Sequence, residues 1–357
     1  MLRCALHDNA RACQQFTPQI YAPLPHLIFP LMTNPSASAP HPAWQLLLLV
    51  GLGVAGLSLA SLLALGLIAG VLGLSVAQFG QLSAAPGSLP HGWAALMLVQ
   101  GLSFAGLGAG VAVLPRLWRQ SAGRYFNPRP LGGAWWPAAA GLLIPVLVPA
   151  LSVVASWNAA ARFPAWAAGF EQWARAKEDE ALVLTKFLTN FPDMAHLLVG
   201  LLVVAVVPAV VEELVFRGVV QRNLVRWTGS RTVGVWLAAA VFSAVHFQFF
   251  GFVPRLLLGL LLGYLYEWSG NILLPMAAHF TNNALQLILL YVVQHRAAVP
   301  AALNPDANVA LPWPLVALSA VLGAGGLYGL WRQTRPVPVG LAEGLPTLPP
   351  PRPAGSA

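Results

Sequence analysis

The feature that most limits how this chain can fold is a series of long blocks without any Asp, Glu, Lys or Arg. The first block runs from Trp44 to Pro115, which is long enough for two membrane-spanning helices. Further uncharged blocks occupy 132–161, 194–211, 232–254, 268–295 and 307–331. A helix needs about 20 apolar residues to cross a hydrocarbon layer of about 30 Å. The pattern therefore predicts an all-α fold, a polytopic bundle of transmembrane helices.

Composition excludes several other classes of protein. Only 8% of the 357 residues are charged, whereas soluble domains carry about 25%. The net charge is +8, but the basic residues are mostly arginines spread over short connections and not gathered in a recognition patch. We therefore expect no nucleic acid among the partners. Cys4 and Cys13 both lie near the N-terminus and provide neither a disulfide framework nor a cysteine zinc site.

The uncharged blocks and the connections between them predict about eight spans. These spans are 44–73, 92–114, 134–156, 195–225, 232–249, 253–268, 271–293 and 312–331. The connection between the second and third spans carries four arginines and no acid, so the positive-inside rule places it in the cytoplasm. Alternation from there puts both termini in the cytoplasm, with Arg255 and Arg296 as isolated exceptions on the outer side.

The segments outside the spans suggest how the chain is organised. Residues 1–43 are expected to be a disordered N-terminal tail, in which the MTNPSASAP beginning at Met32 offers an alternative start. Residues 44–331 form the predicted transmembrane domain, and the Pro-rich residues 332–357 a disordered C-terminal tail. Within the long connection 157–193, apolar residues at helical spacing among mixed charges predict an amphipathic helix on the outer surface.

Three clusters of polar residues interrupt the apolar spans. They are Glu212, Glu213 and Arg217 in EELVFR, Phe242 and His246 in FSAVH, and His279 and Asn283 in HFTNN. An ionisable group costs about 2.5–3.5 kcal/mol at the centre of a spanning helix on insertion scales, so such groups are candidates for a functional site.

The spacing of these residues predicts how they are used. Glu213 and Arg217 are four residues apart and share one helix face, so they are expected to pair. Glu212 then lies on a different face and is left for chemistry. His279 and Asn283 also share a face. With a rise of 1.5 Å per residue, Glu212, His246, His279 and Asn283 fall within a layer of roughly 10 Å near mid-membrane.

A purely structural interpretation remains open for each cluster taken alone. A single intramembrane histidine is often a hydrogen-bonding residue of the core, and a pair of glutamates at the end of a span is often a solvated helix end. Phe242 is interpreted as a packing residue. The three clusters together argue for a site, because unrelated polar residues are not expected at matching depths.

The three motifs resemble those of a known family. EELVFR fits EExxxR, FSAVH fits FxxxH and HFTNN fits HxxxN, in the family's order. On these residues the chain resembles the CPBP family (CaaX protease and bacteriocin-processing, also called Abi) of intramembrane endopeptidases, which is related to the prenyl-protein CaaX endopeptidase. The resemblance covers residues 195–293, the catalytic core of that family.

The resemblance implies a peptidase in which Glu212 and His246 activate a water molecule. It further implies that His279 and Asn283 hold the oxyanion of the tetrahedral intermediate and that Glu213 and Arg217 support the site. The substrate would be a membrane-associated protein or peptide, and the location the bacterial cell (inner) membrane. A carboxylate desolvated among apolar helices binds its proton more tightly, which suits a general base near neutral pH.

Three alternatives to this mechanism remain open. Two His and two Glu are also ligand types for zinc, although the sequence has no HExxH and asparagine is an unusual zinc ligand; the resemblance favours no cofactor. A non-catalytic membrane scaffold or bacteriocin-immunity protein would keep the fold without proteolysis. A transporter would also use intramembrane acids, but it leaves the HxxxN spacing unexplained.

Overall fold

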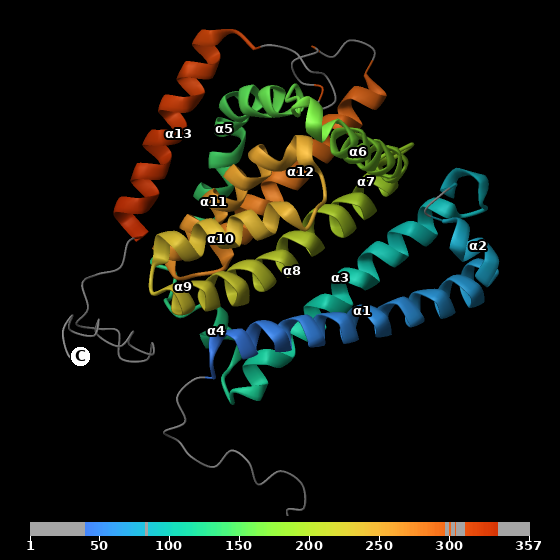
Figure 1. Ribbon diagram of the computed structural model, residues 1–357, viewed down its shortest axis with the longest axis horizontal. Coiled ribbons are helices and arrows are strands. Elements are labelled where there is room, and N and C mark those ends of the chain that lie inside the picture. Colours follow the sequence, from blue (N-terminus) through green and yellow to red (C-terminus); the bar gives the residue numbers. More distant parts are fainter. Residues whose placement is uncertain (1–39, 83–84, 297–299, 301–303, 305–310, 335–357) are drawn as a thin grey trace, which may run out of the picture. The chain divides into compact units, whose positions relative to one another are not determined.

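The computed structural model describes residues 40–82, 85–296, 300, 304 and 311–334 of the chain. These residues form helices and connections, and no strand occurs among them. The first helices are α1 (Pro42–Leu72), α2 (Val76–Gln81), α3 (Gly92–Leu117), α4 (Ala122–Phe126), α5 (Trp136–Ala159) and α6 (Ala168–Leu188). They are followed by α7 (Met194–Gly200), α8 (Val207–Val215), α9 (Arg222–Thr228), α10 (Arg231–Ala244), α11 (Phe252–Ser269), α12 (Leu273–His295) and α13 (Trp313–Thr334) (Figure 1).

Seven helical segments of the described chain are long and apolar enough to cross a membrane. They are Pro42–Leu72, Gly92–Leu117, Trp136–Ala159, Met194–Thr228, Phe249–Ser269, Leu273–His295 and Trp313–Thr334. The predicted fold class, a polytopic bundle of transmembrane helices, is therefore confirmed. The cytoplasmic location of both termini stays a prediction. The predicted tails lie outside the described residues, except where α1 begins at Pro42 and α13 ends at Thr334.

The fifth expected span, 232–249, is shorter than the sequence suggested. Its helix, α10, has 14 residues, about 21 Å at 1.5 Å per residue, which is less than the hydrocarbon thickness. The helix ends at Ala244, and Phe247 adopts a left-handed backbone with φ of 53°. Such a conformation breaks a right-handed helix. The block without Asp, Glu, Lys or Arg continues through this turn, so the charge pattern alone gave no sign of the break.

The helices that carry the three motifs pack against one another. α8 contacts α12, α12 contacts α11, and α11 contacts α10. Phe216, Val219 and Phe242 belong to one buried apolar cluster between these elements. On the other side of α8 lies α3, which in turn packs along α1. α8 thus lies between the α1–α3 pair and the elements that bear His246 and His279.

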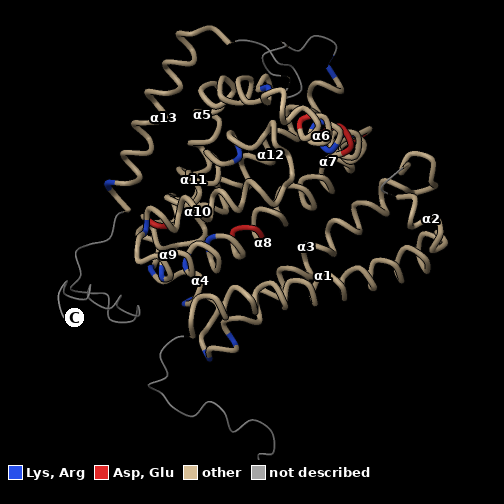
Figure 2. Tube along the Cα trace, in the orientation of Figure 1, with Lys and Arg blue, Asp and Glu red and all other residues tan. Residues whose placement is uncertain are grey.

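The connection between α5 and α6 is fixed by one acidic residue of the amphipathic helix. Figure 2 shows most of the acidic residues of the described chain on α6 and α8. Glu171 of α6 accepts hydrogen bonds from the Phe163 N–H at 2.8 Å, from Arg175 at 2.9 Å and from Arg162 at 3.1 Å. The Phe163 N–H first, and then the two guanidinium groups, lower the pKa of Glu171 to about 2. The helix predicted within 157–193 is therefore present as α6, and its location on the outer surface stays a prediction.

Candidate active site

The first motif lies on a helix whose backbone is irregular on both sides. α8 is preceded by a π-helical turn, Leu201–Val206, and followed by another, Phe216–Gln221. Such turns are rare in proteins and are frequent at functional sites. Each one shifts the faces of the helix relative to a regular α-helix, so the angles that a uniform helix assigns to Glu212 and Arg217 do not hold across this segment.

Glu213 is the most enclosed charged residue of the site. Its side chain is 0% exposed and its Oε1 atom accepts hydrogen bonds from Arg217 Nη1 at 2.9 Å and from His279 Nδ1 at 2.8 Å. The Glu213–Arg217 pair expected from the four-residue spacing is therefore present. The other carboxylate oxygen, Oε2, is buried and has no hydrogen-bond partner among the described residues. Glu213 thus connects the first motif to the third.

Arg217 ties the site to two further helices. Its Nη2 atom donates to the Gly259 carbonyl of α11 at 2.9 Å, and its guanidinium carbon lies 4.8 Å from the centre of the Phe242 ring of α10. Only 1% of the residue is exposed. Losing one member of a buried ion pair typically costs about 3–5 kcal/mol. Arg217 is therefore placed to hold α8, α10 and α11 together around Glu213.

His279 lies between the two glutamates. Its Nδ1 atom contacts Glu213, and its Nε2 atom is 3.8 Å from Glu212 Oε2. A carboxylate only accepts hydrogen bonds, so Nδ1 carries a hydrogen and Nε2 faces Glu212. The side chain of Glu212 keeps 14% of its surface exposed. Although the sequence placed the two glutamates on different faces, both reach the same imidazole.

His246 lies in the turn that follows α10. Its Nδ1 atom donates to the Phe242 carbonyl at 2.8 Å. Because a carbonyl oxygen only accepts, a neutral His246 keeps its lone pair on Nε2. The Phe242 ring packs edge-on against both histidines, with centroid distances of 5.2 Å to His246 and 5.9 Å to His279. Phe242 is buried, so the packing role expected for it agrees with its contacts, and it also joins the second motif to the third.

Asn283 is held by groups other than the glutamates. Its Nδ2 atom makes a long hydrogen bond of 3.5 Å to the Val204 carbonyl, and its Oδ1 atom accepts from Asn282 at 3.1 Å. Proline has no N–H, so Pro208 cannot donate to the carbonyl four residues earlier, which is that of Val204. This carbonyl accepts from Asn283. The structure brings Glu212, Glu213, Arg217 and His279 together. Asn283 instead faces the π-helical turn Leu201–Val206, which precedes α8.

Arg255 is a charged residue of this region that the sequence did not single out. The charge pattern of the sequence marks Arg255 only as an isolated exception to the positive-inside rule. In the structure its Nη2 atom donates to Gln248 Oε1, two residues after His246. The sequence around Arg255, PRLLLG, matches none of the three motifs. The signal was the presence of a cation between two uncharged blocks.

The arrangement of possible metal ligands bears on the zinc alternative. A catalytic zinc ion has three protein ligands in most enzymes. Among the described residues, no group of three or more His, Cys, Asp or Glu side chains is arranged to hold a metal ion. His279 Nδ1 is in addition occupied by Glu213. The donor set does not fit a three-ligand zinc site, and catalysis without a cofactor stays a prediction.

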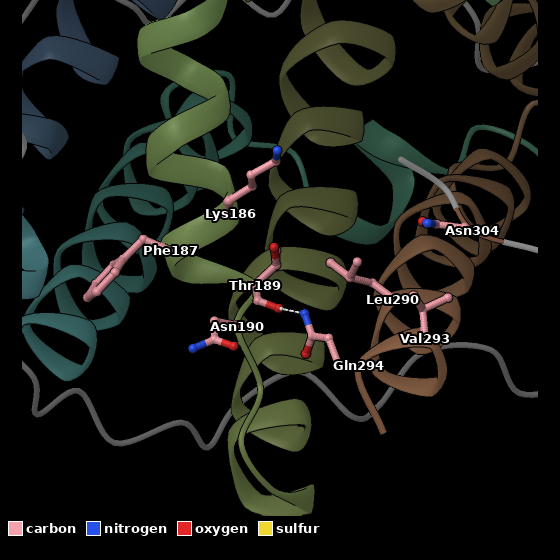
Figure 3. A pocket seen from close by; sticks show the side chains of 8 residues that line it. All are labelled: Lys186, Phe187, Thr189, Asn190, Leu290, Val293, Gln294 and Asn304. Atoms are coloured by element: carbon pink, nitrogen blue, oxygen red, sulfur yellow. Dashed lines mark hydrogen bonds between the residues drawn. The ribbon is translucent and has the colours of Figure 1, made fainter. Parts of the chain in front are cut away.

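A pocket elsewhere on the molecule contains none of the motif residues. It has a volume of about 470 Å³ and lies between the end of α6 and the last turns of α12 (Figure 3). Its lining residues are Lys186, Phe187, Thr189, Asn190, Leu290, Val293, Gln294 and Asn304. Gln294 crosses it to donate to the Thr189 carbonyl at 2.9 Å. This pocket therefore contributes nothing to the chemistry of the three motifs.

Comparison with known proteins supports the resemblance drawn from the motifs. Residues 194–285 match the family described as type II CAAX prenyl endopeptidase Rce1-like. Over 80 residues the chain is 38% identical to the uncharacterized protein YpbD of Bacillus subtilis (strain 168). That alignment covers 21% of this chain and 38% of the relative. No solved structure matches the chain.

The matched family segment contains every residue of the three motifs. It begins where α7 begins and ends inside α12, so it covers the helices that form the site. α1, α3, α5 and α13 lie outside it. The similarity to CaaX-type proteases is thus confirmed for the part of the chain that bears the motifs, within an integral multi-pass membrane protein.

Proposed function

We propose that this protein is an intramembrane endopeptidase that hydrolyses a peptide bond in a membrane-associated protein or peptide. Its water molecule is activated by Glu212 and His246, without a cofactor. The location we propose is the bacterial cell (inner) membrane. The similarity of residues 194–285 to a family of CAAX endopeptidases supports the reaction type.

One observation carries the proposal: a chain of contacts runs from buried Glu213 through His279 towards Glu212. Glu213 orients the imidazole by accepting from Nδ1 at 2.8 Å, and Nε2 is thereby directed to Glu212 at 3.8 Å. A carboxylate that orients a histidine, which in turn faces a reacting group, is the arrangement that hydrolases use on several unrelated folds. A merely structural histidine would not need two carboxylates.

In the proposed reaction, a water molecule donates one hydrogen bond to Glu212 and another to His246 Nε2. Glu212 takes the proton as the water oxygen attacks the carbonyl carbon of the peptide. The same proton then passes to the leaving amine, so that one peptide and one water yield a carboxylic acid and an amine. General-base catalysis of this kind contributes about a hundredfold to ten-thousandfold in rate.

The oxyanion of the intermediate is assigned to His279 and Asn283. Because Nδ1–H of His279 is already donated to Glu213, a donor on Nε2 requires the imidazolium form. Asn283 would leave its long bond to Val204 to donate to the oxyanion. One such donor is worth about 3 kcal/mol.

The experiment that tests this proposal compares the membrane peptidomes of cells that express the native protein or Glu212→Gln. The proposal predicts peptides that appear only with the native protein, each with one new terminus, while both proteins reach the same level in the membrane. Identical peptidomes from equally abundant proteins would contradict it and would favour the scaffold alternative.

A further inference from the structure

Arg255, at the start of α11, extends into the turn that carries His246. Its Nη2 atom donates to Gln248 Oε1, and its guanidinium lies over the backbone of Gly251, where a Cβ would be 3.5 Å from Nη2. Gln248 is two positions after His246 in the sequence. The charge of Arg255 also interacts electrostatically with both His246 and Glu212. A cation is therefore fixed beside the proposed site.

Half of this guanidinium has no partner. The Nη1 atom of Arg255 is buried and makes no hydrogen bond within the described part of the chain. Arginine stays charged in proteins, and a buried charge is expected to be paired and hydrogen-bonded. Arg217 meets this expectation, since its Nη1 atom binds the Glu213 carboxylate and its Nη2 atom the Gly259 carbonyl. Arg255 has only the neutral amide oxygen of Gln248.

The carboxylates near Arg255 are committed elsewhere. Glu178 of α6 interacts with Arg255 electrostatically, but its Oε1 atom accepts from the Phe250 N–H at 3.1 Å. Burial raises the pKa of this carboxyl, which weakens it further as an anion. Glu212 is the proposed base. Among the described residues neither glutamate comes within ion-pair distance of the guanidinium.

Helix α6 covers this cation. The Arg175 guanidinium carbon lies 3.8 Å from the centre of the Phe250 ring, and Phe170 and Trp173 pack against Phe249 with centroid distances of 5.1 Å and 5.6 Å. These contacts cover Phe249 and Phe250, which follow Gln248, with side chains of α6, while Phe247 stays exposed. In such a place a charge-assisted hydrogen bond is stronger than in water, so an anion that reaches Arg255 is bound tightly.

We infer that Arg255 anchors the substrate by binding a carboxylate of the peptide through its unpartnered Nη1 atom, next to the bond that is cut. This inference rests on the proposed function. A guanidinium presents two parallel N–H donors that match the two oxygens of a carboxylate. In a peptide this group is either the C-terminus or the side chain of an Asp or Glu, and both offer the same chemistry. Arg255 would thereby set where along the substrate the cut falls.

Binding of peptides to inactive protein tests this inference without any cleavage. Glu212→Gln protein in phosphatidylcholine nanodiscs is immobilised and exposed to a pool of apolar decapeptides. The pool exists in three forms: with a free C-terminal acid, with a C-terminal amide, and as the amide with one Ala replaced by Glu. Retained peptides are quantified by mass spectrometry. The same measurement is repeated on protein that carries Arg255→Gln in addition.

We expect the Glu212→Gln protein to retain at least one of the two carboxylate forms roughly tenfold to a hundredfold more than the plain amide. Added Arg255→Gln should bring this ratio close to one. Retention of the free acid alone identifies the C-terminus as the source of the carboxylate, and retention of the Glu amide alone identifies a side chain. Equal retention of all three forms, or an unchanged ratio with Arg255→Gln, would overturn the inference.

Two further variants separate binding from folding. Arg231→Gln removes an exposed arginine that pairs with Glu267 at 3.1 Å and should leave the ratio unchanged. Arg255→Lys keeps the charge but loses the fork of donors, so its ratio should lie between those of the parent and Arg255→Gln. If Arg255→Gln does not accumulate in the membrane, Arg255→Lys decides the question.

The inference and the proposed function fail in different ways. If the native protein cleaves no peptide but the carboxylate preference depends on Arg255, the anion site stands and the peptidase does not. If cleavage is found but the preference is absent, the peptidase stands and Arg255 is a structural residue of the His246 turn.

Discussion

The α1–α3 pair and the helices around α8 both bring membrane-spanning segments into close contact, but with different chemistry. α1 and α3 meet at Gly56 and Gly106, where a Cβ on either glycine would overlap the other's carbonyl oxygen. Around α8 the contacts are polar: Arg217 and His279 each bind the Glu213 carboxylate in a nearly closed interior. Small residues are a common means of packing helices in lipid, whereas buried charges are costly there.

The comparison distinguishes the α1–α3 contact, which only packs two helices, from the polar cluster around α8, which belongs to the proposed site. α1 and α3 associate through close backbone packing without any buried charge, so helix association in this bundle does not by itself require buried charges. Burying charges costs free energy that the packing of small residues avoids. A buried charged cluster is therefore expected to have a function. Substitutions in the two regions should therefore differ in what they damage.

The largest effect is expected from Arg217→Ala. It leaves the Glu213 carboxylate buried without its cation, which costs roughly 3–5 kcal/mol. We predict a strongly lowered Tm in detergent, poor accumulation in the membrane and loss of activity. The exposed pair Arg231–Glu267 provides the control, because Arg231→Gln should change stability by only about 0–1 kcal/mol. An unchanged Tm in Arg217→Ala would show that the ion pair does not stabilise the fold.

A smaller effect is expected from Gly56→Ala. The added methyl group meets the backbone of Gly106, which cannot rotate away as a side chain would. Overpacking of this kind costs about 1–3 kcal/mol. The rate of cleavage per folded molecule should stay the same, in contrast to substitutions around α8.

The matched control on the same helix is Gly51→Ala, where nothing lies within 4 Å of the added Cβ. It should leave Tm unchanged or raise it slightly, since alanine favours the helix. Equal Tm values for the two variants would contradict the close contact between α1 and α3.

The smallest effect is expected from removal of metal ions. If Glu212 activates water without zinc, dialysis against a chelator should change neither the cleavage rate nor Tm, and purified protein should contain less than stoichiometric metal. Activity that is lost on chelation and restored specifically by zinc would show instead that the motif residues are metal ligands.

Much of the fold followed from the charge pattern alone. The predicted spans match each of the seven long helices of the described chain to within a few residues, because lipid excludes charged side chains from most of a spanning segment. The short α10 was not predicted, since the residues from Val245 to Phe249 contain no Asp, Glu, Lys or Arg, and the charge pattern is the same for a turn as for a helix. What ended that helix was a backbone conformation at Phe247, which composition does not record.

The sequence identifies the residues of the three motifs, whose catalytic roles stay predictions, but it does not specify how their side chains contact one another. Four-residue spacing was enough for the Glu213–Arg217 pair, because that contact lies within one helix. The contacts of His279 with both glutamates depend on how α12 packs on α8, and the orientation of Asn283 depends on how α12 packs on the turn Leu201–Val206. Such long-range contacts are set by tertiary packing, and a local pattern does not specify them.

The most direct test of the account is the activity of purified Glu212→Gln, assayed on a substrate found in the peptidome comparison and set against Tm. The amide keeps the shape of the side chain and removes the base, so cleavage should fall by at least about a hundredfold. Tm should not fall, because the buried charge is removed together with its desolvation cost. A folded Glu212→Gln protein that cleaves at the native rate would show that Glu212 is not the base.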